Sequence, residues 1–390
     1  MDIQEISDSL KNPRILDWII YSFIISYFIF LILLIQAWNG LNEPENSQTD
    51  YPFITVLIPV RNEVTNLPGL IQCLENQTYP TDNFEVVFID DNSDDGTYEH
   101  LMSFSKTSTV NIRVYKLEAD DNDKISHKKA SISYGVTKSS GEFIVLTDGD
   151  VYFGRYWIKS FADIFQRTGS KFISGPVVMD SQSFTDDIQS LEFSSLIGAG
   201  AAAIYYNNPV LCNGANLAFK RETFIEVNGY EGYNRIISGD DEFLMYKVSK
   251  LYPSKVFFLK SEKAIVHIQP ESGIKEFYHQ RRRWSGKWSK HPNPLSKVLA
   301  LYVFIINLSF LLLFILGIIK LLPAYTVILL WTIKLILEFV YFKQMYLFFI
   351  KKLKILPFLI SAFAYPVYAV TFGILSNMGG YKWKGRYYKN

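Results

Sequence analysis

Four apolar stretches that are long enough to cross a membrane stand out from the pattern of hydrophobic and polar residues. They cover residues 18–37, 299–319, 321–342 and 355–375. At about 1.5 Å of rise per residue, some 20 helical residues cross the roughly 30 Å hydrocarbon layer of a bilayer. Helices buried in a soluble core do not account for four such stretches. The pattern therefore predicts an integral membrane protein with one N-terminal and about three C-terminal spans.

Between the first two stretches, short apolar runs alternate with segments of helix length. These runs are residues 54–60, 84–90, 112–117, 143–147 and 172–179. Their length and apolar continuity are typical of buried strands, and helical patterns occur between them, at about 67–74 and 130–136. Strands separated by helices form βαβ units, so we expect an α/β domain around a parallel sheet with both faces covered.

Composition divides the 390-residue chain into six segments. We expect a polar N-terminus at 1–17, a membrane anchor at 18–38, a polar linker at 39–51, the α/β domain at 52–294, a membrane region at 295–378 and a basic tail at 379–390. The first apolar stretch is too long for the apolar core of a signal peptide and lacks a small-residue cleavage pattern. We therefore interpret it as a retained anchor.

Charge and cysteine content exclude several classes of protein. A net charge of +1 gives no support for a nucleic-acid partner. The only cysteines, Cys73 and Cys212, form no CxxC pair, so neither a disulfide framework nor a zinc site is predicted. This cysteine usage fits a reducing compartment.

Two carboxylates follow the predicted strand at 143–147, in the sequence Asp148-Gly149-Asp150. The glycine permits a tight turn, and ligands of open α/β sheets bind outside the carboxyl ends of strands. Hard oxygen ligands suit Mg²⁺ or Mn²⁺, which would be shared with substrate phosphates. The same short motif is common in ordinary turns, so its weight comes from its surroundings.

Polar clusters also follow the first two predicted strands. The sequence PVRNE at 59–63 ends the first strand and either reaches a ligand or simply starts a helix. Four acids within residues 90–95 end the second strand, and one such carboxylate could read the N–H of a uracil-like base. Asp94 and Asp95 are more simply interpreted as a solvated helix start.

Two clusters lie on either side of the Asp148 motif. Lys128 and Lys129 precede it and could neutralise a diphosphate, although exposed lysines more often have no specific role. The small polar turn Asn213-Gly214-Ala215-Asn216 follows it and leads into an apolar run.

Two further clusters precede the second apolar stretch. Asp240 and Asp241 belong to the sequence SGDDEF, which indicates either a solvated helix start or a catalytic carboxylate. The sequence QRRRW at 280–284 is partly explained as a basic and aromatic belt at a membrane surface.

Taken in order, these motifs resemble the membrane-bound, inverting family 2 glycosyltransferases of GT-A fold. PVRNE, DDNSDDGT, HKKAS, TDGD, NGAN, SGDDEF and QRRRW follow one another within residues 54–284. This is similar to the D, DxD, D, QxxRW pattern of the group with cellulose, chitin and hyaluronan synthases and ceramide glucosyltransferases. Single motifs are weak, but their order and spacing are specific. The resemblance implies a Rossmann-like GT-A domain inserted between the membrane helices.

The resemblance also implies roles for the matching residues. The donor would be bound by Pro59, Arg61, Glu63, Asp91, Lys129 and Asp148, with Asp91 on the base and Glu63 near the ribose. Asp148 and Asp150 would hold Mg²⁺ or Mn²⁺. Asp241 would be the general base beside Asp240, and Arg283 would stabilise the negative charge on the diphosphate. Asn213, Gly214, Gln280 and Trp284 would lie at the acceptor and diphosphate end. Asp240 stands where many members have glutamate, and His127 where glycine is frequent.

The implied reaction is a single displacement with inversion from a nucleoside-diphosphate sugar, with uridine favoured in the donor. The tail sequence YKWKGRYY resembles the WxGR ending of ceramide glucosyltransferase-like members, and the apolar stretches are fewer than processive synthases carry. We therefore expect one sugar to be added to a lipid or lipid-linked glycan acceptor, with membrane lipids as further partners. The alternative is a processive polysaccharide synthase.

Charges near the spans predict an orientation. Six cations from Arg281 to Lys297 precede the second span, which places the catalytic domain in the cytoplasm, on the inner or plasma membrane. Lys11, Arg14 and the basic tail indicate the opposite side. Prolines at 357 and 366 could make the last segment re-entrant. The basic tail would then return to the cytoplasmic side, in agreement with the other charges.

Two alternatives come from other classes. A transporter with a nucleotide-sensing domain needs polar residues along several spans, and Lys334 and Glu338 are more simply an i,i+4 pair. A non-catalytic relative would be expected to have lost Asp150 or Asp241, and both are present.

Overall fold

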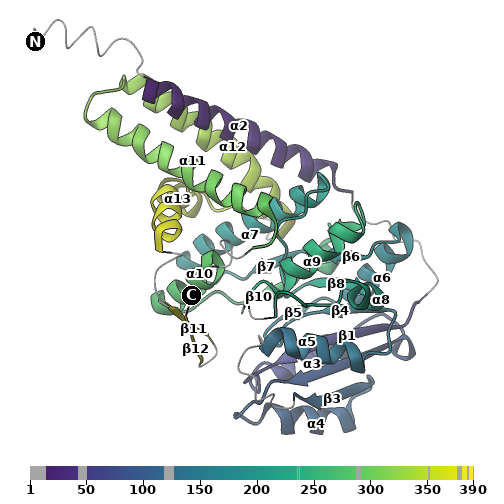
Figure 1. The fold of residues 1–390 in the computed structure, drawn as a ribbon. Coiled ribbons are helices and arrows are strands. Elements are labelled where there is room, and N and C mark those ends of the chain that lie inside the picture. The colour runs from purple at the N-terminus through teal and green to yellow at the C-terminus, as the bar shows by residue number, and fades with distance from the viewer. Residues whose placement is uncertain are drawn as a thin grey trace, which may run out of the picture.

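An α/β domain is joined to a bundle of long helices in the computed structural model (Figure 1). The structure describes residues 15–42, 51–117, 127–234, 236, 238–286, 291–349, 352–375, 380–383 and 386–389. The sequence-based expectations for Lys11, Arg14 and most of the 39–51 linker lie outside these residues, as does part of the basic tail.

The strands form two sheets in the α/β domain and a terminal hairpin. They are β1 (Ile54–Val60), β2 (Phe84–Asp90), β3 (Ile112–Lys116), β4 (Phe143–Leu146), β5 (Tyr152–Phe153), β6 (Phe172–Ser174), β7 (Val177–Met179), β8 (Leu217–Lys220), β9 (Val256–Phe258), β10 (Val266–Ile268), β11 (Gly380–Trp383) and β12 (Arg386–Lys389). The main sheet has the order β3-β2-β1-β4-β8-β6-β9, and β5-β10-β7 form the second sheet. The β11–β12 hairpin is the third.

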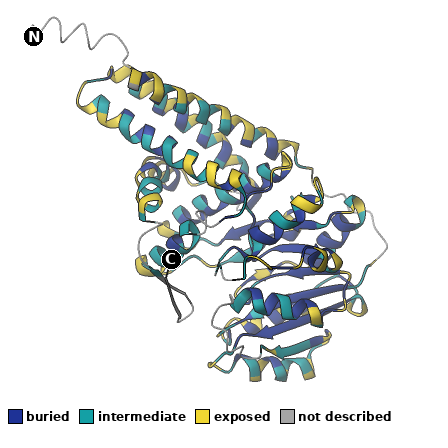
Figure 2. Ribbon diagram, in the orientation of Figure 1, coloured by how far each residue is buried: buried dark blue, intermediate teal, exposed yellow. Residues whose placement is uncertain are grey.

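The predicted strands of the first half are confirmed and pair as expected. β1 pairs in parallel with β2 and β4, with Ile54 opposite both Phe84 and Phe143. Nearly every residue of β1, β2 and β4 is buried, which explains their continuous apolar sequence (Figure 2). Their carboxyl ends therefore lie side by side at one edge of the sheet.

The expectation of a wholly parallel sheet is wrong in the second half of the domain. β8 runs antiparallel to both β4 and β6. The single strand expected at 172–179 is two strands in different sheets, broken at Gly175-Pro176. A Cβ on Gly175 would lie 2.4 Å from the Asn216 amide nitrogen, and that nitrogen donates to the Pro176 carbonyl at 2.7 Å. This close packing and a proline without an N–H end the ladder.

The helices of the α/β domain cover the main sheet and fill its connections. They are α3 (Leu67–Glu75), η1 (Thr81–Asn83), α4 (Thr97–Thr107), α5 (His127–Lys138), α6 (Trp157–Thr168), α7 (Phe184–Tyr205), α8 (Arg221–Glu226), α9 (Asp240–Leu251), η2 (Glu262–Ala264) and α10 (Ile274–Gly286). The helices expected at 67–74 and 130–136 are thus confirmed as α3 and α5.

Helix α7 lies between the sheet domain and the long helices (Figure 1). Its small residues permit close approach: a Cβ on Gly198 would lie 2.4 Å from Met345 Sδ, and one on Gly200 2.6 Å from the Leu211 carbonyl. The Tyr341 hydroxyl donates to the Ser195 carbonyl at 2.8 Å. Helix α7 therefore fixes the bundle against the α/β domain.

Within the described ranges, four helices are long and apolar enough to span a membrane, one N-terminal and three C-terminal. They are α2 (Ile15–Gly40), α11 (Pro294–Ile318), α12 (Ala324–Phe349) and α13 (Ile355–Leu375). Much of their outer surface is exposed and apolar, as a lipid-facing surface requires (Figure 2).

The buried charges of the bundle form the expected local pair. Lys334 Nζ lies 2.7 Å from Glu338 Oε2 and also donates to the Ala362 carbonyl at 2.8 Å. The Tyr27 hydroxyl donates to the other Glu338 oxygen at 2.6 Å. These bonds join α2, α12 and α13 inside the bundle, so a structural role accounts for both charges.

Candidate active site

One cavity of about 1480 Å³ brings together most of the residues expected in the site. Its lining includes Asp148, Asp150, Asn213, Gly214, Asp240, Asp241, Gln280, Arg283 and Trp284. These residues come from the turn after β4, the turn before β8, the start of α9 and helix α10. Residues far apart in sequence therefore share one solvent-accessible space.

The Asp148-Gly149-Asp150 turn is held by packing on both sides. The Thr147 hydroxyl donates to the Ala215 carbonyl at 2.7 Å, which joins this turn to the one at 213–216. A Cβ on Gly149 would lie 2.9 Å from Glu63 Cγ and 3.0 Å from Val60 Cγ1. Glycine is thus needed here for close approach to the end of β1.

Lys128 is the cation that faces the acids of the cavity. Its Nζ lies 2.7 Å from Asp148 Oδ1 and 3.4 Å from Asp240 Oδ2. Burial alone would lower the pKa of the Lys128 ammonium, but the carboxylates of Asp148 and Asp240 outweigh it and raise that pKa above its usual range. The cavity therefore holds a permanent positive charge beside its carboxylates.

Lys129, which the resemblance placed at the donor, does not line the cavity. Lys129 is fully buried, and its ammonium binds backbone carbonyls, including that of Tyr233 at 3.1 Å. Successive helical residues point about 100° apart, so only one of two adjacent lysines faces the cavity. That residue is Lys128.

Helix α9 starts directly at the cavity, after Gly239 with a φ of 83°. Asp241 is half-buried and lines the cavity, and its Oδ1 accepts from the Glu242 N–H at 2.8 Å. Glu242 is fully buried with His291 Nε2 3.6 Å away, which is a structural position. The positive end of the helix dipole favours negative charge on acids in this first turn.

Gly214 leaves the space in front of these charged groups open. A Cβ there would lie 3.2 Å from Lys128 Nζ and 3.4 Å from Asp240 Oδ2. We predict that Gly214→Val lowers transfer by roughly 10²-fold, because it displaces charged groups that must be placed within about 1 Å. Steady-state rates measure this effect. Gly154→Val is the matched control, since nothing lies within 4 Å of its Cβ position; equal rates for the two variants would contradict the prediction.

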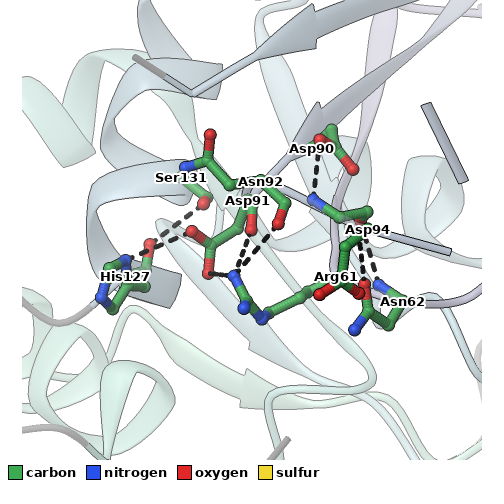
Figure 3. Close-up of polar contacts among 9 residues, drawn as sticks. Arg61, Asn62, Asp90, Asp91, Asn92, Asp94, His127 and Ser131 are labelled. Atoms are coloured by element: carbon green, nitrogen blue, oxygen red, sulfur yellow. Dashed lines mark hydrogen bonds and ion pairs between the residues drawn. The ribbon is translucent and has the colours of Figure 1, made fainter. Parts of the chain in front are cut away.

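Asp91 directly follows β2 and lies within a group of polar side chains (Figure 3). Arg61 Nη1 donates to the Asp91 carbonyl at 2.6 Å, and His127 Nδ1 lies 3.2 Å from Asp91 Oδ1. Arg61 and His127 approach Asp91 from two sides (Figure 3). Asp91 does not line the cavity, but His127 directly precedes Lys128 at the start of α5, so the two groups are neighbours.

Two further residues expected at the donor, Pro59 and Glu63, do not line the cavity. Pro59 is a half-buried residue of β1. The Glu63 carboxylate is buried, accepts from Asn66 Nδ2 at 2.7 Å and packs under Gly149. Asn66 itself lines the cavity. Asp95 accepts from the Thr97 N–H at 3.0 Å, as expected for a helix start. The donor roles of Pro59 and Glu63 remain predictions.

Helix α10 presents Gln280, Arg283 and Trp284 to the cavity and is anchored by Arg281. The buried Arg281 guanidinium lies 2.6 Å from Glu192 Oε2 and 4.4 Å from the centre of the Trp284 ring. It also donates to the Gln280 side-chain oxygen. Sequence patterns do not distinguish Arg281 from the two arginines that follow it.

Glu271 is a second residue that motif reasoning missed. Its Oε1 accepts from Gln280 Nε2 at 2.8 Å. Burial raises the pKa of the Glu271 carboxyl, with the charges of Arg283 and Arg281 opposing and that of Asp150 reinforcing the rise. Glu271 lines the same cavity as Asp150 and Arg283.

The cavity continues from the acids into the bundle. Its far part, called here the apolar arm, is lined by Ala199 and Ala203 of α7, Ala300 and Phe304 of α11, and Tyr368 and Phe372 of α13. Lys275, His279 and Lys297 line the cavity as well. The apolar arm therefore connects the charged end to helices long enough to span a membrane.

The donor set fits a divalent cation that shares its ligands with a substrate. Asp148 and Asp150 supply hard carboxylate oxygens at one end of the cavity, and Lys128 already shows that this position attracts a cation. No group of three or more His, Cys, Asp or Glu residues suited to a metal occurs within the described part of the chain. A cation held here would therefore take further ligands from phosphate oxygens and water.

Comparison with known proteins gives a family model and several relatives. Residues 55–238 match the model described as glycosyl transferase family 2. Glycosyltransferase AglE of Haloferax volcanii is 32% identical over 126 residues, which are 32% of this chain and 40% of that protein. A dolichyl N-acetyl-alpha-D-glucosaminyl phosphate 3-beta-D-2,3-diacetamido-2,3-dideoxy-beta-D-glucuronosyltransferase of Methanococcus voltae is 23% identical over 159 residues, 39% of this chain and 48% of that protein. The chain spans less than half the length of these curated relatives.

A solved structure shares the fold. Mannosyltransferase PcManGT from Pyrobaculum calidifontis, in complex with GDP-Man and Mn²⁺, superimposes with a TM-score of 0.57 at 15% identity, over 90% of this chain and 96% of that one. This likeness confirms the expected GT-A arrangement, with the α/β domain between one N-terminal and three C-terminal helices.

Proposed function

We propose that this chain, whose residues 55–238 match the family 2 glycosyl transferase model, transfers a hexose, with inversion, from a nucleoside-diphosphate sugar to a lipid or lipid-linked acceptor. The observation that carries the proposal is the single cavity that unites the acids at the sheet edge with the apolar arm. A nucleotide sugar suits the charged end, and a lipid tail suits the arm.

The proposed step is a single displacement at the anomeric carbon. An acceptor hydroxyl oxygen forms a bond to that carbon, while the bond from the carbon to the diphosphate oxygen breaks. Asp241 takes the hydroxyl proton, and the nucleoside diphosphate leaves with the bonding electron pair. No covalent enzyme intermediate is needed, as in one-step inverting glycosidases. Within the first turn of α9, Asp241 suits this role because it is half-buried and lines the cavity, whereas Asp240 is buried and faces Lys128.

Negative charge grows on the departing diphosphate, and cationic groups of the cavity stabilise that charge. Lys128 and Arg283 both line the cavity, at the end where Asp148 and Asp150 lie. Asp148 and Asp150 would hold Mg²⁺ or Mn²⁺, which when bound neutralises charge on the diphosphate. Asp91 would read the base, with uridine favoured because a carboxylate accepts from the uracil N3–H.

Position in the membrane supports a lipid acceptor. Helices α11 and α13, which supply part of the apolar arm, are long enough to span a bilayer. Cations at the start of α11 and along α10 favour a cytoplasmic catalytic domain in the inner or plasma membrane. Relatives with lipid-linked products in their names include beta-monoglucosyldiacylglycerol synthase of Nostoc, 27% identical over 120 residues. That name supports a lipid acceptor here without identifying it.

We predict that Ala300→Trp blocks the apolar arm and lowers transfer to lipid by about tenfold or more, a loss of ~1.4 kcal/mol of transition-state stabilisation. The donor end is untouched, so nucleotide affinity measured by calorimetry should remain within about twofold of wild type. Val298→Trp is the matched control, because Val298 lies on the same helix and is 61% exposed. Full transfer by Ala300→Trp would remove the arm from the acceptor path, and long polymeric products would favour a polysaccharide synthase.

A further inference from the structure

Lys129 binds the segment that leads into helix α9. Its ammonium donates to the carbonyl of Tyr233 at 3.1 Å, to that of Ser238 at 3.3 Å, and to that of Ile236. The three acceptors lie within six residues of the chain, directly before Gly239. One side chain on α5 thus holds several points of the segment at 233–238.

The surroundings of this ammonium are otherwise mostly aromatic. Lys129 is 1% exposed, and its Nζ lies 4.6 Å from the centre of the Phe243 ring and 5.9 Å from that of Tyr230. A charge buried this deeply is tolerated only where donors and acceptors are matched. Three N–H groups and three carbonyls provide that match.

We infer that Lys129 is a positioning residue, which fixes Tyr233, Ile236 and Ser238 ahead of α9 so that Asp241 faces the cavity. Gly239 joins this segment to Asp240 with a φ of 83°, a conformation that glycine adopts at little cost. Because glycine constrains the joint weakly, the carbonyl contacts of Lys129 set the direction in which the first turn of α9 begins. The inference rests on the proposed function, in which Asp241 is the base.

Deprotonation of Lys129 should produce a characteristic decline of activity at alkaline pH. Burial lowers the pKa of the Lys129 ammonium to about 8, against the opposing charges of Asp240 and Asp241. Tyr230, whose own pKa is raised by burial, and the adjacent Lys128 are the other titratable groups nearby. Above that pH the neutral amine has two N–H groups for three carbonyls, so the segment loosens.

Loss of activity in this pH range is not loss of folding. The folded-state pKa of Lys129 lies below its ordinary value of 10.5, so the unfolded chain binds more protons between about pH 8 and 10.5. The contribution of Lys129 to the free energy of unfolding therefore rises with pH across this window. A fall in turnover without a fall in thermal stability therefore identifies local loosening.

The kinetic test compares Lys129→Met and Lys129→Arg with Lys138→Met, a control at the opposite end of α5. We expect Lys129→Met to lower kcat by about tenfold or more while the donor KM stays within about threefold, because the base and not the donor is misplaced. Lys129→Arg should keep most of kcat and lose the alkaline decline near pH 8, since a guanidinium stays charged. A raised donor KM with unchanged kcat, or a wild-type kcat in Lys129→Met, would overturn the inference.

Hydrogen exchange separates this inference from the proposed function. In the full-length protein without substrate, peptides covering 233–241 should exchange faster in Lys129→Met than in wild type or Lys138→Met. Unchanged exchange would refute the positioning role even if the protein transfers sugar. Faster exchange in a protein that transfers no sugar would refute the proposed function and leave the structural tether standing.

Discussion

Replacing Asp241 with asparagine should lower sugar transfer by about 10²–10⁴-fold while donor binding persists. Asparagine keeps the shape of the side chain and can still accept the Glu242 N–H that Asp241 binds at 2.8 Å. It cannot take a proton from the acceptor hydroxyl. General-base catalysis contributes about 10²–10⁴-fold, so the single-turnover rate should fall by that factor. Nucleotide affinity, measured by calorimetry, should change less than about twofold.

Asp82→Asn is the matched control for this experiment, because Asp82 is an exposed acid in η1, outside the cavity. It should retain wild-type turnover. Full turnover by Asp241→Asn would show that Asp241 is not the general base. Asp240 would then be the candidate, because it is the other acid in the first turn of α9 that lines the cavity.

Asp150→Asn should be the second variant with a large effect. A unit charge pair at ~4 Å contributes about 4 kcal/mol at an effective dielectric constant near 20. Loss of one carboxylate from a metal pair should therefore lower transfer by roughly 10³-fold, at ~1.4 kcal/mol per factor of ten. The same change should make nucleoside-diphosphate affinity independent of Mn²⁺, as measured by titration with and without a chelator.

The affinity measurement distinguishes two causes of lost activity in Asp150→Asn. Wild type and Asp82→Asn should bind nucleoside diphosphate more tightly with Mn²⁺ than with chelator. A variant that lost its activity but kept this difference would place the cation elsewhere, for example nearer Glu271, which is electrostatically coupled to Asp150. Metal-independent binding in the wild type would contradict the assignment to Asp148 and Asp150.

The sequence predicted the first half of the α/β domain well, for a physical reason. β1 and β2 are buried on both faces, so their apolar runs have clear ends at polar turns. β8, β9 and β10 are only three or four residues long, too short to show a period. The antiparallel pairing of β8 and the second-sheet pairing of β10 depend on distant partners. One example is the packing of Asn216 against Gly175, which local patterns do not contain.

The candidate site shows the same division. Motif positions predicted which turns meet at the cavity, because the carboxyl ends of neighbouring strands share an edge. They did not predict which side of α5 faces it, and so chose Lys129 over Lys128. Arg281 and Glu271 were missed because their importance lies in partners such as Glu192 and Gln280, far away in sequence.

The most direct test of the account is sugar transfer into lipid by the full-length protein in membranes. Membranes containing wild type or Asp241→Asn are incubated with radiolabelled UDP- and GDP-sugars, with Mn²⁺ or chelator, and lipids are then extracted and sized. The account predicts label in lipid bearing a single sugar, only with wild type and Mn²⁺. Equal label from Asp241→Asn, or no lipid-extractable label with any donor, would contradict it.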